Sequence, residues 1–171
     1  MHQYGPDSRL LVALLALLCS LYLAFNVSPL AGLFAVVALW LVWDALRHGS
    51  VWYGFHAFRR GDLGAVRLSL VQMRWPNLLD VESRAYYHWL KGVIDVADSR
   101  FAAAKVHLLV AASGQLRTEN DRSLVHCLLA EVALQESDKA AAHEHLRHAR
   151  ALQHHPNVDR MINSLSSRLE K

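Results

Sequence analysis

A run of 34 residues without a single charged side chain, Leu10–Trp43, constrains this chain more than any other feature. The chain carries 18 Lys and Arg and 15 Asp and Glu residues, and only Asp7 and Arg9 precede the run. The remaining charges make up about 24% of residues 44–171, as in an ordinary soluble domain. An apolar content of 53% excludes a disordered chain, and the uncharged run argues against a wholly soluble single domain. The sequence therefore predicts two different parts.

The uncharged run is too long for one membrane-crossing helix. A helix of 34 residues would be about 51 Å long, whereas the hydrocarbon core of a bilayer is ~30 Å thick. Pro29 disfavours helix at Ser28, and Asn26 competes for backbone hydrogen bonds, so the run should break there. We therefore predict a transmembrane helical hairpin in residues 1–48, with spans at about 10–26 and 29–46.

Basic residues near the span ends predict the orientation of this hairpin. Arg9 precedes the first span and Arg47 follows the second, while the turn between them has no Lys or Arg. The positive-inside rule then places both termini in the cytoplasm, which predicts a multi-pass protein of the bacterial inner membrane. The residues expected at the membrane interface are the charged and aromatic ones around the spans, namely Arg9, Trp40, Trp43, Asp44, Arg47 and Trp52.

From residue 50 onward the pattern is helical, and no strand-like alternation is present. Polar residues that favour helix N-caps recur along this part. They predict about seven helices of roughly 10 to 17 residues in an all-α domain of residues 50–171. The candidate N-caps are Ser50, Asp62, Asp80, Ser99, Asp121, Ser137 and Asn157.

An internal repeat emerges when this part is shifted by 38 residues against itself. Small residues, a helix break and a leucine coincide in three units, predicted at about 50–78, 80–114 and 121–153, with a last helix at 158–169. Small side chains let two antiparallel helices approach closely, and the leucine fills the groove between them. The matching sets are Gly54, Gly92 and Ala130; Gly61, Ser99 and Ser137; Ala65, Ala103 and Ala141; and Leu70, Leu108 and Leu146.

The clearest units are Gly92-(x11)-Ala104-(x3)-Leu108-(x2)-Ala111 and Ala130-(x11)-Ala142-(x3)-Leu146-(x2)-Ala149. Their spacing resembles the tetratricopeptide repeat. The period is 38 rather than the family's 34, which implies longer loops between units. Lys91 and Asp95 stand where the family usually has apolar or aromatic residues, and Val66 replaces the usual alanine. A generic array of helical hairpins is the alternative.

The resemblance implies a short solenoid whose concave face binds extended peptides or partner helices. Core packing between repeats is the alternative role for Tyr86 and Trp89, although aromatic residues are also common interface anchors. Carried over from the family, the groove positions are Phe55, Phe58, Arg59, Tyr86, Trp89, Val93, Leu124 and Glu131.

The sequence predicts no catalytic residues, metal site or cofactor. The eleven histidines form no recognisable ligand set, and the two cysteines, Cys19 and Cys127, do not suggest a disulfide framework. No Gly-rich phosphate loop or nucleophile motif is present, so we expect a protein that is not an enzyme. Basic and aromatic residues do not interleave, which argues against nucleic-acid binding.

These features predict a membrane-anchored adaptor that recruits or stabilises other protein subunits, membrane proteins among them, at the lipid bilayer. Its layout resembles an exopolysaccharide-synthase accessory subunit of the Pel type and a membrane protein associated with haem synthesis. The alternative is a small integral accessory subunit of a larger membrane enzyme, polysaccharide-synthase or transport complex. In that case the hairpin would pack into the complex, because its small residues permit close helix packing.

Overall fold

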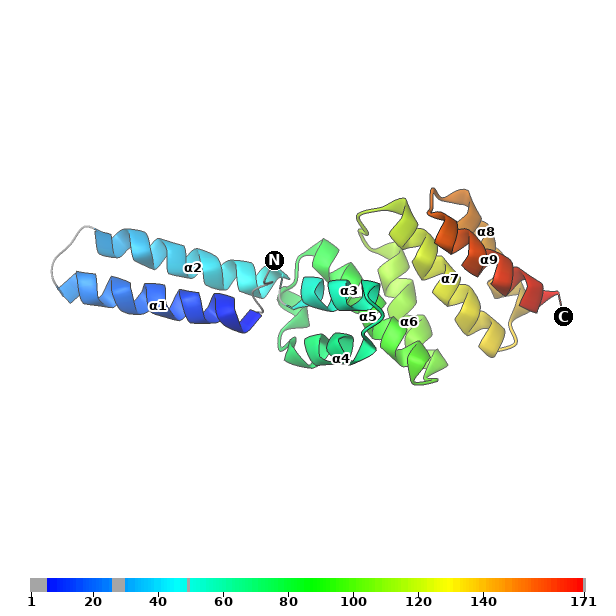
Figure 1. Cartoon of the computed structure of the whole chain (residues 1–171), viewed down its shortest axis with the longest axis horizontal. Coiled ribbons are helices and arrows are strands. Elements are labelled where there is room, and N and C mark those ends of the chain that lie inside the picture. The colour runs from blue at the N-terminus through cyan, green and yellow to red at the C-terminus, as the bar shows by residue number, and fades with distance from the viewer. Residues whose placement is uncertain (1–5, 26–29, 49, 171) are drawn as a thin grey trace.

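The structure is a computed structural model that describes residues 6–25, 30–48 and 50–170. Every regular element in these ranges is a helix, which confirms the all-α class. In the first two ranges, side chains are described at residues 11–12, 14–22, 32–40 and 42–43. Figure 1 shows an elongated arrangement, with a long helical hairpin extending from one end of an array of further helices.

The long hairpin consists of α1, Pro6–Phe25, and α2, Leu30–His48, which pack side by side along their lengths (Figure 1). The break predicted at Asn26–Pro29 lies outside the described residues.

The prediction that this hairpin crosses a membrane twice is wrong. In the described parts of the chain, no helix is both long and apolar enough to span a bilayer. The charge-free part of α1, Leu10–Phe25, is about 24 Å long, and that of α2, Leu30–Trp43, about 21 Å. A ~30 Å hydrocarbon core needs about 20 apolar residues. The multi-pass inner-membrane localisation with cytoplasmic termini is corrected accordingly.

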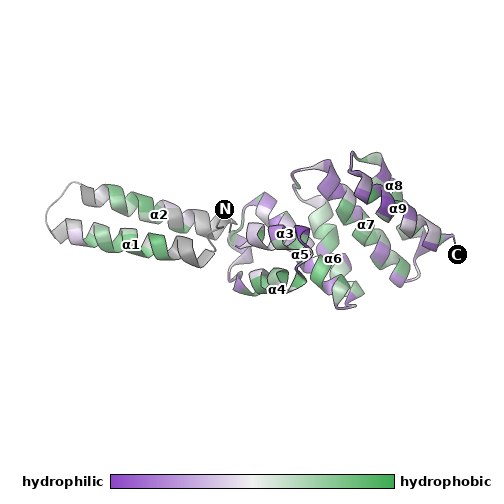
Figure 2. Cartoon of the chain, in the orientation of Figure 1, coloured by the Kyte–Doolittle hydropathy of each residue, from purple (hydrophilic) through white to green (hydrophobic). Residues whose placement is uncertain are grey.

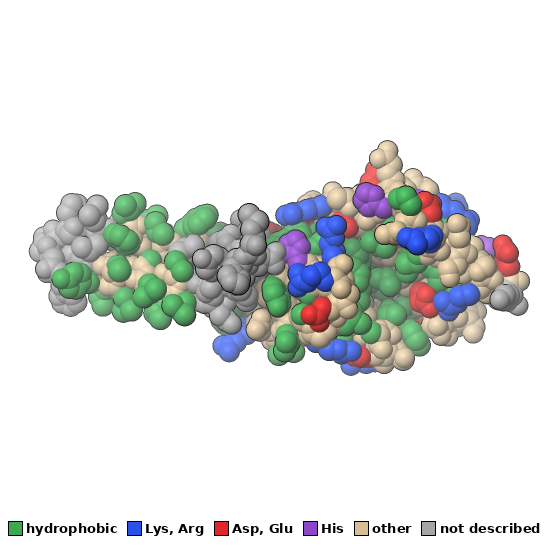
Figure 3. Space-filling view, in the orientation of Figure 1, with side chains coloured by type: hydrophobic (Ala, Val, Ile, Leu, Met, Phe, Trp, Pro, Cys, Tyr) green, Lys and Arg blue, Asp and Glu red, His purple; other side chains and the backbone are tan. Residues whose placement is uncertain are grey.

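The described outer surface of the long hairpin is apolar all the same. Ala38, 1% exposed, is buried between its helices, whereas large apolar side chains on several sides of both are exposed. Figure 2 colours the described parts of α1 and α2 largely as hydrophobic, and Figure 3 shows the same side chains at the surface. The most exposed of them are Leu11, Leu14, Leu18, Leu21, Tyr22, Leu33, Val36, Leu39, Trp40 and Trp43.

The array is built from three shorter hairpins and a last helix (Figure 1). In each hairpin the two helices pack against one another, and α9 packs against the third. The first hairpin is α3, Val51–Arg59, with α4, Leu63–Gln72, and the short helix η1, Pro76–Leu78, follows it. The second is α5, Val81–Ala97, with α6, Phe101–Ser113. The third is α7, Glu119–Gln135, with α8, Lys139–Ala151, and α9 spans Pro156–Leu169.

The three hairpins turn in the same way. Gly61, Ser99 and Ser137, which the 38-residue shift superposes, all have a positive φ, between 59° and 78°. At Gly61 the backbone N–H donates to the Phe58 carbonyl, and the next N–H donates to the Ala57 carbonyl. The same two bonds recur at Ser99 and Ser137. This is the Schellman geometry, in which a left-handed residue ends a helix.

This geometry explains why some predicted N-caps are wrong. Ser99 and Ser137 end the preceding helices, so α6 and α8 are capped one residue later, at Arg100 and Asp138. The remaining differences are that α7 is capped by Thr118 rather than Asp121, and α9 by His155 rather than Asn157. The predictions for Asp62 and Asp80 are confirmed, and Ser50 stands at the predicted N-cap position without a side-chain cap hydrogen bond.

Helix packing in the second hairpin depends on the absence of a side chain at Gly92. A Cβ added there would lie 2.7 Å from the side chain of Leu108, which is fully buried. Ala104, one turn earlier on α6, is also fully buried. The close approach predicted from the small residues and the recurring leucine is therefore present in this hairpin.

Candidate functional site: a pocket shared by the three hairpins

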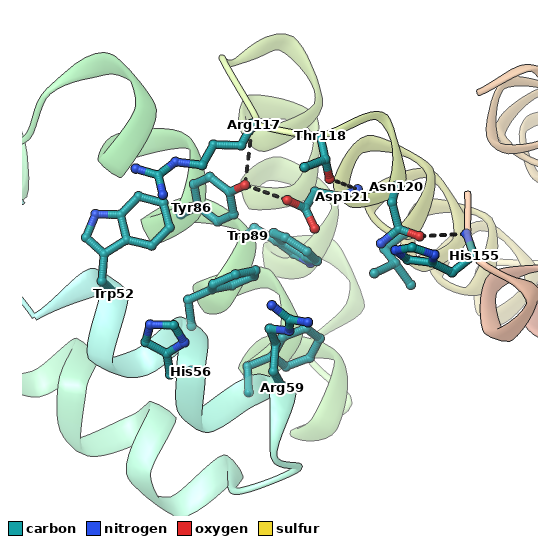
Figure 4. Close-up of a pocket in the computed structure, with 13 residues that line it drawn as sticks. Trp52, His56, Arg59, Tyr86, Trp89, Arg117, Thr118, Asn120, Asp121 and His155 are labelled. Carbon is teal, nitrogen blue, oxygen red and sulfur yellow. Dashed lines mark hydrogen bonds between the residues drawn. The ribbon is translucent and has the colours of Figure 1, made fainter. Parts of the chain in front are cut away.

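A pocket of about 470 Å³ opens where α3, α5 and the start of α7 meet (Figure 4). Its lining combines aromatic side chains from the first two hairpins with polar ones from the connection into the third and from the start of α9. The lining residues are Trp52, Phe55, His56, Phe58, Arg59, Tyr86, Trp89, Arg117, Thr118, Asn120, Asp121, Leu124 and His155.

The aromatic part of the pocket rests on two side chains of α5. Tyr86 and Trp89 are both 0% exposed, so their rings form part of the core as well as the lining. The ring of Phe55 on α3 lies 4.8 Å from that of Tyr86 and 5.5 Å from that of Trp89. The ring of Phe58 lies 5.5 Å from that of Trp89. Edge-to-face contacts of this kind fix the relative positions of α3 and α5.

Trp89 also carries a polar group that no other described residue pairs with. Its indole Nε1–H is buried and has no hydrogen-bond partner among the described residues. The nitrogen is itself closed off from solvent, so a ligand oxygen reaches it only when a neighbouring side chain moves. An unpaired buried donor costs about 1–3 kcal/mol, and a bond to such an oxygen would remove that cost.

A hydrogen-bonded network closes the side of the pocket toward the third hairpin (Figure 4). The Tyr86 hydroxyl donates to Oδ2 of Asp121 at 2.6 Å and accepts from the backbone N–H of Arg117 at 3.2 Å. Burial and the hydrogen bond to the carboxylate raise the pKa of Tyr86 well above its usual value. The tyrosine therefore stays neutral and joins the second hairpin to the third.

Two arginines place positive charge on the rim. The guanidinium of Arg117 lies 4.0 Å from the ring centroid of Trp52 and forms an ion pair with Glu82. Arg59 is exposed at the end of α3, and no hydrogen bond or ion pair joins it to another described residue. Arg59 is therefore the rim charge that remains open to an anionic ligand.

Six of the eight residues predicted for a binding groove line this pocket: Phe55, Phe58, Arg59, Tyr86, Trp89 and Leu124. Val93 is buried in the core below them. Glu131 is held at 2.8 Å by Arg168 of α9, so the last helix engages its carboxylate.

The structure describes only three of the six side chains predicted for a membrane interface. Trp52 lines the pocket, where its ring lies 4.8 Å from that of Tyr86. Trp40 and Trp43 are exposed on α2. The side chains of Arg9, Asp44 and Arg47 lie outside the described residues.

The polar side of the pocket was not predicted from the sequence. Arg117, Thr118, Asn120 and Asp121 come from the connection between α6 and α7 and the first turn of α7, and His155 precedes α9. One signal was present: Thr118 and Asp121 have capping-box spacing, and Thr118 Oγ1 accepts from the Asp121 backbone N–H at 3.0 Å.

The other side chains with reactive chemistry form no comparable site. Burial raises the pKa of Cys127 to about 12, so its thiol stays protonated at neutral pH. In the part of the chain that the structure describes, no three metal-ligating side chains lie close enough together to hold an ion.

Comparison with known proteins adds no further constraint. No protein-family model, curated protein or solved structure matches the chain. The basis for a functional proposal is therefore the architecture of the chain itself, an all-helical array with a pocket shared by three hairpins.

Proposed function

We propose that this protein is a protein–protein interaction adaptor whose helical array binds a short segment of a partner protein in the pocket. The segment is one that carries a carboxylate side chain next to an aromatic or aliphatic residue. The proposal includes both the resemblance to the tetratricopeptide repeat and the adaptor role that this resemblance implies.

The observation that carries the proposal is the combination of an unsatisfied donor and an open cation in an aromatic pocket. The indole N–H of Trp89 lies unpaired among the described residues just behind the lining, where a ligand reaches it once a neighbouring side chain moves, and Arg59 offers a guanidinium at the rim. A carboxylate or peptide carbonyl could accept from Trp89, and Arg59 favours an acidic side chain. The rings of Phe55 and Phe58 provide the apolar surface on which an anchor residue would pack.

The size of the pocket limits the ligand. A volume of about 470 Å³ lies in the range of small-ligand sites and suits one or two side chains of an extended segment. A folded domain would need a much larger contact area.

Peptide display against the full chain tests the proposal. Selected peptides should share an acidic residue next to an aromatic or aliphatic one, and their binding can be measured by fluorescence anisotropy. Trp89→Phe removes the N–H while keeping an aromatic ring, and should weaken binding about tenfold, as expected for one lost hydrogen bond. Arg59→Ala should weaken binding of acidic peptides and reduce its salt dependence.

The chain provides a matched control for Arg59. Arg60 is the next residue, is also exposed and does not line the pocket. Arg60→Ala should leave peptide affinity unchanged. Equal losses for Arg59→Ala and Arg60→Ala would mean that only general positive charge matters, and the pocket would lose its assigned role.

A second candidate function rests on a different observation, the exposed apolar surface of α1 and α2. Monomeric proteins rarely expose a contiguous apolar patch of this kind. The hairpin would be covered by apolar helices of a larger complex, of which this protein is an accessory subunit. Replacing Leu18 and Leu21 with serine should then release the protein from that complex while peptide binding is retained. If the purified chain associates instead with lipid vesicles in the absence of a partner, lipid covers the hairpin.

A further inference from the structure

A polar pair recurs at one position in each of the three hairpins of the array; it is buried in the first hairpin and half-buried in the other two. The 38-residue shift that relates the hairpins takes Ser50 to His88 and His126, and takes Ser69 to His107 and His145. The first member of each pair lies at the start of, or within, the first helix of its hairpin, and the second member lies on the second helix. The position thus faces the seam between the two helices in every hairpin, with serines in the first and histidines in the other two.

The contacts across the three seams differ in kind. In the first hairpin, the hydroxyl of Ser50 donates to the backbone carbonyl of Ser69 at 2.6 Å. In the second, Nδ1 of His88 lies 3.1 Å from Nδ1 of His107, a hydrogen-bond distance that needs a single proton between the two nitrogens.

In the third hairpin the rings of His126 and His145 are tilted against one another rather than hydrogen-bonded. The ring centroids of His126 and His145 are 5.6 Å apart, and His148 of α8 stacks on His126 at 5.2 Å. The Nδ1 atoms of His126 and His145 are buried without a hydrogen-bond partner among the described residues.

The charged groups around these histidines come from several helices. Lys91 and Arg84 on α5 face His88, and Lys91 also acts on His107. Oδ2 of Asp95 lies 3.9 Å from Nε2 of His107, but Arg100 already binds that carboxylate. In the third hairpin, Glu144 of α8 and Asp138, the N-cap of α8, favour a charged His145. His148 of α8 and Lys105 of α6 oppose that charge. A charged His126 is opposed by His145 and His148.

We propose that the two histidine pairs make the second and third hairpins open in mild acid, while the serine pair leaves the first hairpin insensitive to it. When both histidines of a pair are protonated, two cations face each other across a half-buried seam. Among the described residues, neither seam contains a free carboxylate close enough to compensate both. The helices then separate so that water can solvate both charged rings fully.

The direction of the effect follows from the protonation of the folded and unfolded chains. Burial is the main cause that lowers the pKa of His88, His107 and His145, and it lowers the pKa of His126 to about 4. In the unfolded chain a histidine has a pKa of about 6.5. Below that value the unfolded chain binds more protons than the folded one, so stability is complete above about pH 6.5 and falls as the pH drops.

One histidine of the array has the opposite effect on the pH dependence of stability. His154 gains a hydrogen bond to Asp159 at 2.9 Å, which raises its pKa above the usual value. It therefore adds stability in acid and loses it as the pH rises. His154 lies outside both seams, so it does not alter the difference between the hairpins.

Equilibrium urea unfolding of the full chain at pH 7.5 and 5.0 tests the proposal. At pH 5.0, which is 1.5 units below the pKa of a free histidine, His126 alone should raise the unfolding equilibrium constant about 30-fold. The double variants His88→Gln/His107→Gln and His126→Gln/His145→Gln should each lose part of the wild-type acid dependence. His143→Gln on the exposed surface of α8 is the control and should keep all of it. Double variants with the wild-type acid dependence would overturn the proposal.

Two further measurements use the wild-type chain and do not depend on whether the variants fold. Ring titrations of the four histidines by NMR should give pKa values below 6.5, and values at or above 6.5 would overturn the proposal. Hydrogen exchange at pH 5.0 should show α5–α8 opening before α3 and α4. Opening of α3 and α4 at the same pH would refute the distinction between the serine and histidine seams. None of these readouts depends on what the pocket binds.

Discussion

The long hairpin of α1 and α2 and the second hairpin of the array are built alike but have different surroundings. Both consist of two helices of more than ten residues that pack side by side, each with a small residue at the seam. In the long hairpin, Ala38 is buried while leucines of both helices are exposed. In the array, α5 and α6 contact neighbouring hairpins, and Trp89 and Leu108 are fully buried, although Val106, Leu109 and Val110 of α6 are exposed.

The comparison shows that hairpin geometry alone does not produce a core. Two helices can bury only the stripe along which they touch, and a stack of hairpins buries part of the remaining apolar surface. The long hairpin has no such neighbours among the described residues, so substitutions at its outer surface should affect stability much less than substitutions in the array.

Truncation of a tryptophan should show the largest difference between the two regions. Trp89→Ala removes a fully buried indole and should destabilise the chain by about 3–5 kcal/mol. Trp40→Ala on α2 removes a side chain that is 64% exposed and should change the free energy of unfolding by less than about 1 kcal/mol. Urea unfolding at pH 7.5 measures both. Similar losses would show that the exposed surface of α2 is covered in solution.

Adding one methyl group to a glycine should have opposite effects in the two regions. A Cβ at Gly92 would lie 2.7 Å from Leu108, so Gly92→Ala forces the helices apart and should cost about 1–3 kcal/mol. A Cβ at Gly32 on α2 meets no atom within 4 Å, so Gly32→Ala should stabilise that helix by about 0.5–1 kcal/mol. Thermal unfolding of the two variants measures the contrast. A loss of stability in Gly32→Ala would place a partner against that face of the long hairpin.

Removal of one hydroxyl tests whether the pocket network joins the second and third hairpins. Tyr86→Phe leaves the Asp121 carboxylate buried without its 2.6 Å donor and should cost about 1–3 kcal/mol. Tyr87→Phe on the same helix is the control, because the Tyr87 hydroxyl makes no hydrogen bond to another described residue, and it should be close to neutral. Chemical denaturation followed by circular dichroism distinguishes them. Equal effects at both positions would mean that the network does not stabilise the stacking of the second hairpin on the third.

Several features of the fold could be predicted from the sequence because they depend on local chemistry. The helices of the array, the N-caps Asp62 and Asp80, and the close approach at Gly92 follow from side-chain size and hydrogen-bonding capacity. The membrane hairpin was predicted wrongly because the uncharged run was divided into two spans that were both accepted as membrane-crossing, although each has fewer than about 20 residues. The length of each separate helix decides whether it can cross a bilayer.

The candidate site could be predicted only in part for a related reason. Phe55, Tyr86 and Trp89 were predicted because the resemblance to the tetratricopeptide repeat implies that they stand at groove positions. Arg117 and His155 come from connections between helices. The path of these connections depends on how the hairpins stack, and it cannot be predicted from the spacing of residues in the sequence. The histidine pairs do follow the 38-residue shift, but their effect on stability depends on ring contacts across the seam, which the sequence does not show.

The smallest expected effect concerns the turns that end α5 and α7. Ser99 and Ser137 occupy the left-handed region with φ near 60°, where the side chain of any residue with a Cβ is strained, whereas the first hairpin has Gly61 there. Ser99→Gly and Ser137→Gly should each stabilise the array by up to about 1 kcal/mol, because relief of strain exceeds the added entropy of the unfolded chain. Gly61→Ser should destabilise it by a similar amount. Melting temperatures of the three variants measure these changes, and a loss of stability in Ser99→Gly would mean that the serine side chain makes a contribution greater than the strain it causes.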